Sequence, residues 1–375
     1  MQLGLSENLS SLVTRRWQAA RDGGHLVFSS TQLSIITTAG IPYQLRYCPA
    51  LAMKPQDSTK KNHNDGSNND NNTSAEPKAK KVDPFENPSP DLLLARFPPQ
   101  DPTHALILNK FPVIPHHFIL STKAWKAQTD ILEIADLAAT YECLRAWGET
   151  PTTTSHSDSK SKFNSNPDSS TRTTNRLFAF FNSGQDSGAS QPHRHLQFLP
   201  VEAMHQSGTE SWKPLIDLVT SQPHPPSSFQ SHSSLPFAHF ALPLPPNPTP
   251  DTLRAIYISL YRAAVGAVQG TDPRDGLPSL PTQGPSAISY NLAMTMETMM
   301  IAPRRAETAR VPVDLAAAGD IADPGLVSLN GTILAGTLMV KAESEWDVLR
   351  AQPEILARVL RDVGVPGPGP EHALL

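Results

Sequence analysis

The stretch that decides the fold is Gln191-Pro192-His193-Arg194-His195-Leu196-Gln197. Pro192 is tolerated at the entrance of a strand but not inside a helix, so the residues after it are expected to be extended. Side chains alternate between the two faces of a strand, which puts His193, His195 and Gln197 on one face and Arg194 on the other. The stretch therefore predicts a strand that gathers three polar groups on one face.

These three side chains have a chemistry in common. The imidazole of His195 can attack phosphorus when its second nitrogen donates to an acceptor that holds the tautomer, and a backbone carbonyl would serve. His193 could order the backbone or bind a phosphate oxygen, and the amide of Gln197 can donate a hydrogen bond. Taken alone, a His-x-His pattern more often marks solvated histidines, and a metal pair is a further alternative.

The loop before this strand, residues 182–191, consists of small polar residues and glycines. Such a loop lets backbone N–H groups approach phosphates closely, although by itself it is also compatible with a simple turn. Its position directly before the two histidines favours a phosphate site over solvated histidines.

Composition limits the class of protein. A chain of 375 residues with 38% hydrophobic content can bury a core, and a net charge of -4 argues against a nucleic-acid binder. Cys48 and Cys143 form neither a disulfide framework nor a zinc pattern, which favours a reducing compartment. No apolar run is long enough to span a bilayer, so we expect no membrane partner and a cytoplasmic protein, with the nucleus as a second compartment.

Three segments are rich in Asn, Ser, Thr, Lys or Pro and are expected to be low-complexity insertions or long loops, at about 56–82, 150–175 and 221–250. Between them, hydrophobic periodicity predicts strands and helices. The strands are expected at 105–108, 118–120, 176–181, 193–201, 288–294, 299–302 and 327–340. The helices are expected at 129–147, at 251–269 with Asp251 as its cap, and at 344–361. The fold class is α+β, a mixed sheet with segregated helices.

The glycine-serine loop followed by His-x-His-x-Gln resembles the signature of the diadenosine tetraphosphate (Ap4A) phosphorylases, the fungal ATP adenylyltransferases of the histidine-triad superfamily. Residues 48–55, 109–117 and 290–304 match the family in the same order. The resemblance implies one histidine-triad-like catalytic domain over 1–375, with a mainly antiparallel sheet, helices packed on it, and the C-terminal family region at 251–375.

The resemblance also implies a function, the phosphorolysis of Ap4A by inorganic phosphate to ATP and ADP. His195 would carry the adenylyl group, the transfer would be reversible, and adenosine phosphosulfate could be another donor. No cofactor is required, although a divalent cation such as Mg²⁺ could accompany the nucleotide. The sequence makes no prediction of the oligomeric state.

By the same resemblance, a set of residues would bind the substrate: Lys54, Asn109, Lys110, Asn182, Gly188, Ala189, Ser190, Gln191, Asn291, Met300 and Arg304. Lys54 would reach the polyphosphate, Asn109 and Lys110 the nucleoside, and Asn182 the phosphate end. The last three would line the second nucleotide or phosphate. Alternatives are solvated loop charges for the lysines, a turn residue for Asn109 and a core position for Met300.

Three other functions stay open on the residues. A histidine-triad hydrolase would place a third histidine where Gln197 stands, and the family pattern links glutamine there to transfer onto phosphate. A hexose-1-phosphate uridylyltransferase would have proline in place of Arg194. A non-catalytic nucleotide-binding protein would keep the fold and use its insertions for partners.

Overall fold

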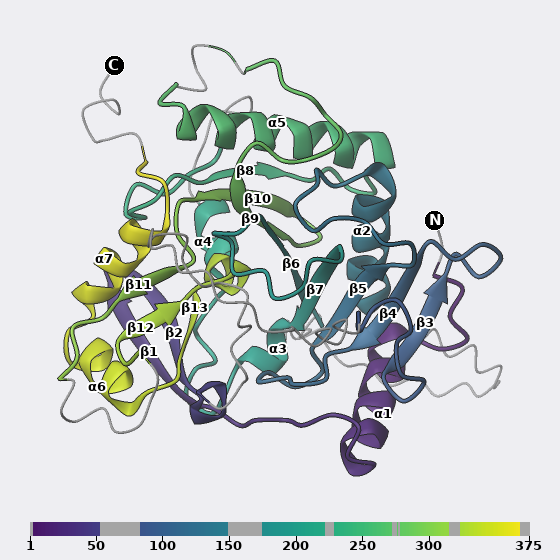
Figure 1. Ribbon diagram of the computed structural model, residues 1–375, viewed down its shortest axis with the longest axis horizontal. Helices are drawn as coiled ribbons and strands as arrows, with labels where there is room; N and C mark the ends of the chain where they lie inside the picture. Colours follow the sequence, from purple (N-terminus) through teal and green to yellow (C-terminus); the bar gives the residue numbers. More distant parts are fainter. Residues whose placement is uncertain are drawn as a thin grey trace, which may run out of the picture.

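The computed structural model describes residues 3–52, 83–148, 175–221, 229–271, 276, 278–314 and 323–367. Lys54 and the predicted insertion at 56–82 lie outside these residues, as does nearly all of the one at 150–175. At the centre is an eight-stranded sheet in which every neighbouring pair is antiparallel (Figure 1). Across the sheet, the strands run in the order β3 (Leu93–Phe97), β4 (His104–Leu108), β5 (Phe118–Thr122), β7 (His195–Pro200), β6 (Leu177–Ser183), β9 (Ser289–Met294), β10 (Thr298–Arg304) and β8 (Phe240–Pro243).

The central strands are apolar on both faces because both faces are covered. Every residue of β4, β5 and β6 is buried, so the strands show runs of apolar residues rather than a clean alternation. Phe118 of β5 stacks on Phe198 of β7 with ring centroids 4.8 Å apart, in the register that pairs these two residues. Such cross-strand aromatic pairs stabilise the register of the sheet.

Helices cover one face of this sheet. Helix α2 (Ile134–Gly148) contacts β6 and α5 (Pro250–Val268), which in turn contacts β8 and β10, and α1 (Leu9–Asp22) contacts α2 and β3. Figure 1 shows α5 running alongside β8 and β10, with α2 near one end of α5. One hydrophobic core fills the space between these helices and the sheet.

A second hydrophobic core lies on the opposite face, beneath a smaller sheet and short helices. The smaller sheet is β1 (Gln32–Thr38), β2 (Ile41–Tyr47) and β13 (Thr337–Val340). Around it lie η1 (Pro49–Leu51), α3 (Val201–Met204), α4 (Leu215–Thr220), the pair β11 (Thr308–Arg310) and β12 (Leu326–Ser328), η4 (Gly331–Ala335), α6 (Glu343–Ala351) and α7 (Glu354–Val363). The α+β fold with a mainly antiparallel sheet and packed helices is therefore confirmed.

Several boundaries differ from the predicted ones for tertiary reasons. The helix expected from residue 129 begins at Ile134, because backbone N–H groups before it donate elsewhere, Ile131 to the carbonyl of Gly284 and Leu132 to the hydroxyl of Tyr257. The hydroxyl of Thr249, rather than Asp251, caps α5 by accepting from the N–H of Thr252.

Two other predictions need correction. The single closing helix expected at 344–361 is two helices, because Pro353 cannot continue the hydrogen-bond ladder of α6. The long loop expected at 221–250 is wrong for the described residues 229–250: Phe237 is buried, and β8 forms the edge of the main sheet beside β10. The apolar residues of β8 pair with β10, a strand distant in sequence, and the periodicity within residues 221–250 does not indicate this pairing.

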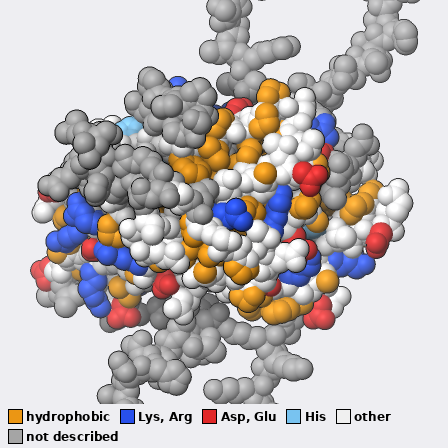
Figure 2. Space-filling model, turned by 90° about the horizontal axis from the view of Figure 1, so that it is seen from above, with side chains coloured by type: hydrophobic (Ala, Val, Ile, Leu, Met, Phe, Trp, Pro, Cys, Tyr) orange, Lys and Arg blue, Asp and Glu red, His pale blue; other side chains and the backbone are white. Residues whose placement is uncertain are grey.

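On the face seen in Figure 2, basic and acidic side chains of the described residues are interspersed among apolar and neutral ones. Within the described ranges, no helix combines the length and hydropathy needed to cross a bilayer. Both cysteines are buried, and neither is part of a disulfide.

Candidate active site

One face of the main sheet carries most of the predicted polar residues. Asn182 of β6 lies opposite Asn291 of β9, and residues opposite each other in an antiparallel pair share a face. Strand register and alternation put His195, Gln197 and Arg304 on this same face. The sheet thus gathers side chains from four strands around His195.

The ring of His195 is held in one tautomer. Its Nδ1 lies 2.9 Å from the backbone carbonyl oxygen of His193, and a carbonyl can only accept, so Nδ1 carries the hydrogen. In the neutral ring the lone pair is then on Nε2. Within the described residues, no hydrogen bond engages that Nε2 atom. The backbone carbonyl anticipated as the acceptor is confirmed.

Burial keeps this ring neutral. Desolvation lowers the pKa of His195 to about 4, against the raising effects of the His193 carbonyl and of the Asp83 carboxylate. A charge on His193 acts in the lowering direction as well. At neutral pH, His195 therefore presents an unprotonated Nε2, which is the state a nucleophile needs.

Gln128 fixes the backbone around His195. Its Oε1 accepts from the N–H of His195 at 2.7 Å, and its Nε2 donates to the carbonyl of Asn182 at 2.8 Å and to that of His195 at 3.1 Å. One buried amide thus joins the start of β7 to the end of β6. This is the point where the regular strand pairing between them has stopped, at Phe180 and Gln197.

His193 precedes the strand rather than beginning it: β7 starts at His195, and His193 forms an isolated bridge with Ala127. Its Nδ1 lies 2.6 Å from Oδ2 of Asp83, and its Nε2 lies 3.0 Å from Oγ1 of Thr122. Both ring nitrogens are engaged within the protein. This geometry favours the role of ordering the backbone, whose carbonyl holds His195, over contact with a phosphate.

Phe85 packs against both histidines, with its ring centroid 5.0 Å from that of His195 and 5.8 Å from that of His193. Asp83 and Phe85 therefore belong to one short segment that contacts the rings of both His193 and His195. The shared contact also agrees with the prediction that the two histidines point to the same side.

A chain of hydrogen bonds orients Gln197. The backbone N–H of Phe111 donates to Oδ1 of Asn109, so Nδ2 of Asn109 is the donor to Nδ1 of His117, at 3.1 Å. Nε2 of His117 then carries its hydrogen and donates to Oε1 of Gln197, at 3.1 Å. The amide N–H groups of Gln197 consequently point away from His117, as donors. Asn109 is therefore a turn residue, the alternative given for it above, and it is also the first residue of this hydrogen-bond chain.

Asn182 is buried beside His195. Its Oδ1 accepts from Nδ2 of Asn291 at 2.9 Å and from the N–H of Gly331 at 2.8 Å. Its Nδ2 is buried with no hydrogen-bond partner within the described residues. The oxygen is thus anchored, and the amide nitrogen is the free donor on the face of His195.

Asn291 and Arg304 hold this anchor in place through hydrogen bonds, and their expected contact with the substrate stays a prediction. Nδ2 of Asn291 donates to Asn182 and to the carbonyl of Ser187, and its Oδ1 accepts from Arg304. The guanidinium of Arg304 also donates to the carbonyls of Ala306 and of Leu329. Burial lowers the pKa of Arg304 to about 10. Nε, Nη1 and Nη2 of Arg304 thus each donate within the protein.

Met300 is fully buried in the second hydrophobic core. The structure therefore places it among core side chains, which agrees with the alternative of a core position, and its substrate contact stays a prediction. Lys110 is exposed, with its Nζ 5.5 Å from the ring centre of Phe111 at the open end of the Asn109 turn. Its expected place near the nucleoside stays a prediction.

The loop before the histidines bends tightly against the residues around η4. Gly188 has φ +78°, and a Cβ there would lie 2.6 Å from the carbonyl oxygen of Leu329. Only glycine fits this backbone and this approach. Ala189, Ser190 and Gln191 follow with partly or fully exposed side chains, at the rim of the site.

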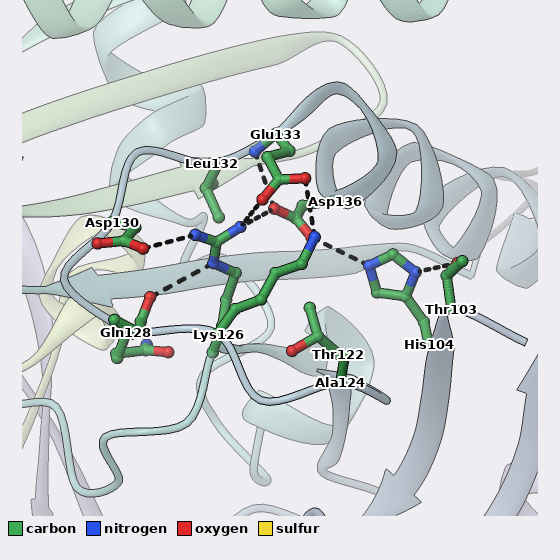
Figure 3. A network of polar contacts seen from close by, with 12 residues as sticks. Thr103, His104, Thr122, Ala124, Lys126, Gln128, Asp130, Leu132, Glu133 and Asp136 are labelled. Carbon is green, nitrogen blue, oxygen red and sulfur yellow. Dashed lines mark hydrogen bonds and ion pairs between the residues drawn. The ribbon is translucent and has the colours of Figure 1, made fainter. Parts of the chain in front are cut away.

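Arg194 points to the opposite face, as the alternation predicts. Its guanidinium lies 2.8 Å from Asp136 and 3.0 Å from Glu133, and Asp136 also contacts His104 at 3.0 Å. Figure 3 shows Glu133 and Asp136 turned toward one another at the start of α2, with His104 beyond Asp136. Hydrogen bonds and opposite charges hold the pKa of the buried Asp136 below its usual value despite desolvation. This network anchors the strand from behind the site.

Sequence reasoning missed three contributors, Asp83, His117 and Gln128. His117 belongs to the segment 109–117 that matches the family, but no role was assigned to it. Asp83 and Gln128 carry no local signal, because each acts through a contact across a long sequence separation. Among the described residues, no group of three His, Cys, Asp or Glu side chains could hold a metal ion.

Two curated proteins of Saccharomyces cerevisiae are similar along nearly the whole chain. Diadenosine 5',5'''-P1,P4-tetraphosphate phosphorylase 2 is 27% identical, over 96% of this chain and 96% of its own length. Protein APA1 is 25% identical, over 97% of this chain and 96% of its own. The crystal structure of yeast Ap4A phosphorylase Apa2 in complex with Ap4A superposes with a TM-score of 0.70 at 23% identity, covering 97% of this chain and 100% of that one.

Two family models match in succession. The Ap4A phosphorylase N-terminal domain matches residues 2–149 and 171–219, and the ATP adenylyltransferase C-terminal domain matches residues 233–366. The two regions meet inside one sheet, where β6 pairs with β9. Because the first model spans more than half of the chain, and the second continues it, this chain belongs to the family of Ap4A phosphorylases and ATP adenylyltransferases.

Proposed function

We propose that this protein cleaves Ap4A with inorganic phosphate, producing ATP and ADP through an adenylyl group carried on His195. The observation that carries the proposal is the state of the His195 ring: Nδ1–H donates to the His193 carbonyl, burial keeps the ring neutral, and Nε2 has no hydrogen bond within the described residues. Membership in the family and the yeast relative that is named a tetraphosphate phosphorylase support the substrate.

In the first step, the lone pair on Nε2 of His195 attacks the α-phosphorus of Ap4A. A bond from nitrogen to phosphorus forms, and the bond from the α-phosphorus to the bridging oxygen breaks. ATP leaves with that oxygen and its electron pair, and AMP remains bound to the histidine. The amide of Gln197, oriented by the Asn109 and His117 chain, donates to phosphate oxygens or to the leaving oxygen without adding a charge.

In the second step, an oxygen of inorganic phosphate attacks the same phosphorus, the bond from nitrogen to phosphorus breaks, and ADP forms. Two displacements invert the phosphorus twice, so the overall reaction retains configuration. The reverse sequence makes Ap4A from ATP and ADP. Adenosine phosphosulfate fits the same scheme, with sulfate as the leaving group.

A divalent cation such as Mg²⁺ accompanies the polyphosphate in this proposal and is carried by the nucleotide. The described residues hold no cluster of carboxylates and histidines that would form a protein cage for it. Comparing the rate of Ap4A phosphorolysis in the presence of Mg²⁺ with the rate in the presence of a chelator measures whether a divalent cation is required. A protein-bound metal that survives exhaustive dialysis would contradict this part.

The deciding experiment gives the protein unlabelled Ap4A and ³²P-labelled inorganic phosphate. The label should appear in the β-phosphate of ADP and nowhere in ATP, with equal amounts of the two nucleotides. Without phosphate, Ap4A should persist. His195→Asn is the matched control and should produce no labelled ADP.

The competing functions give other results in the same assay. A histidine-triad hydrolase would form AMP and ATP without phosphate. A uridylyltransferase would ignore Ap4A and react with uridine diphosphate sugars, and a non-catalytic protein would bind Ap4A without turnover. Any of these outcomes would overturn the proposal.

A further inference from the structure

Ser121 lies directly beside the nucleophile. It belongs to β5, and the antiparallel register of β5 and β7 pairs Ser121 with His195. Paired residues share a face and bring their Cβ atoms to about 4.5–5.5 Å of one another. The hydroxyl of Ser121 is therefore on the face of the sheet where Nε2 of His195 would meet phosphorus.

This hydroxyl is buried and has no partner. Ser121 has 0% exposure, and within the described residues its Oγ makes no hydrogen bond. Its neighbour Thr122 points to the other face and is satisfied by His193. A buried hydroxyl without a partner costs free energy, so native structures rarely keep one unless a ligand or a water completes it.

A second donor without a partner lies on the other side of His195. Nδ2 of Asn182 is also buried and unpartnered within the described residues, and Gln128 bridges the carbonyls of Asn182 and His195, which places these two residues side by side. His195 therefore stands between two unsatisfied donors on its two neighbouring strands. Hydroxyl and amide donors are the groups that stabilise negative charge on phosphate oxygens.

We propose that Ser121 is a catalytic residue whose hydroxyl donates a hydrogen bond to a non-bridging oxygen of the α-phosphorus while His195 attacks, opposite the amide of Asn182. The inference rests on the proposed function. Ser121 keeps its proton throughout, and no bond to its oxygen forms. The binding of the reacting phosphate thus satisfies two donors that the protein alone leaves unpaired.

The test compares Ser121→Ala with the wild type in phosphorolysis of Ap4A. Removing one such donor lowers kcat by about 10²-fold, with a smaller change in KM. The same substitution should leave the thermal midpoint unchanged or raise it, because it removes a buried polar atom that has no partner. Ser34→Ala, on β1 of the small sheet, is the control for the loss of a serine hydroxyl and should keep full activity.

A substrate in which sulfur replaces one non-bridging α-oxygen distinguishes a hydrogen bond from Ser121 to that oxygen from a role of Ser121 in packing. Sulfur accepts hydrogen bonds poorly, so the wild type should discriminate between the two phosphorothioate diastereomers of Ap4A. Ser121→Ala should lose discrimination against one diastereomer only. Ser121→Cys, which keeps the size of the side chain with a weak donor, should behave like Ser121→Ala.

Three results would overturn the inference: an unchanged kcat in Ser121→Ala, a lower thermal midpoint that accounts for the lost activity, or unchanged phosphorothioate discrimination. An adenylyl group that resists acid in the wild type and disappears in Ser121→Ala would also contradict it, because such a group would be on the oxygen of Ser121 rather than on the nitrogen of His195. If the wild type fails to cleave Ap4A, the proposed function fails first, and the two failures remain distinguishable.

Discussion

His195 and His239 are nearly the same histidine in two regions of the molecule. Both are buried, and desolvation lowers the pKa of each to about 4. Each donates Nδ1–H to the carbonyl two residues before it, His195 to His193 at 2.9 Å and His239 to Phe237 at 2.8 Å. They differ at Nε2. In His239 that nitrogen accepts the backbone N–H of His232 at 2.8 Å, whereas in His195 no described residue engages it.

The difference separates a structural histidine from a nucleophile. Burial and the carbonyl contact make both rings neutral with the lone pair on Nε2, so neither property is sufficient for attack on phosphorus. His239 uses its lone pair to close the turn before β8. His195 keeps its lone pair for a substrate, between Ser121 and Asn182, and the surrounding sheet supplies donors rather than a competitor for Nε2.

The largest expected effect comes from replacing each histidine by asparagine. His195→Asn should lower phosphorolysis by more than about 10³-fold and abolish an acid-labile adenylyl group from α-labelled Ap4A, since the nucleophile is gone. His239→Asn should keep the adenylyl group but lose about 1–3 kcal/mol of stability, because the N–H of His232 loses its acceptor in a buried turn. Label trapping and thermal unfolding measure the two effects.

His193→Asn is the control for this pair, and it should still form the adenylyl group, at a reduced rate. If His239→Asn also abolished the adenylyl group, or if His195→Asn retained it, the distinction between the two histidines would be wrong.

The second prediction concerns acid. The unfolded chain protonates both histidines near their ordinary pKa of about 6.5, whereas the folded protein resists until about pH 4. The unfolded state therefore binds more protons in this window, and stability is full above about pH 6.5 and is lost as the pH falls toward 4, by about 3 kcal/mol for each ring. Denaturant unfolding at a series of pH values measures this slope.

The variant His239→Gln should lose less stability over the same window, because one of the two titrating groups is gone. The rate of adenylyl transfer should not show a loss of nucleophile between pH 6.5 and 5. A rate of adenylyl transfer that falls with an apparent pKa near 6.5 would contradict the neutral ring.

The smallest expected effect is at Gln128, whose side chain hydrogen-bonds to the backbone N–H and carbonyl of His195. Within the described residues, no side chain makes such a bond to the backbone of His239. Gln128→Leu leaves the N–H of His195 without its acceptor and frees the start of β7, so kcat should fall by about tenfold and stability by about 1–2 kcal/mol. Gln128→Glu keeps an acceptor and should restore part of kcat. Equal rates in the leucine variant and the wild type would mean that the strand pairing alone positions the nucleophile.

The fold could be predicted from the sequence to a considerable extent, whereas the nucleophile stays a prediction. The hairpin of β4 and β5 and the pair of β9 and β10 followed from runs of apolar residues, and the family match extended along the chain. The errors in the fold have a common cause. The late start of α2 and the strand β8 depend on partners distant in sequence, which local periodicity does not contain.

The substrate residues divide in the same way. Asn182 and Gln197 keep donors that face the site, because their oxygens are held by Asn291 and by His117. Arg304 and Met300 were also expected beside the substrate. In the structure the guanidinium of Arg304 donates to backbone carbonyls and Met300 lies in the second core, so their substrate contacts stay predictions. A sequence shows which side chains can donate, but not which donors are already used.

By itself, the sequence determined that His195 and Gln197 share a face and that Arg194 opposes them, because alternation along a strand is a local property of the backbone. It also determined the tight glycine-bearing loop before them. Only the tertiary structure decided which nitrogen of His195 stays free, because that depends on burial and on Gln128, 67 residues away, and on Asp83, 110 residues from His193. Desolvation and long-range hydrogen bonds are properties of the assembled fold, and they make this one histidine reactive.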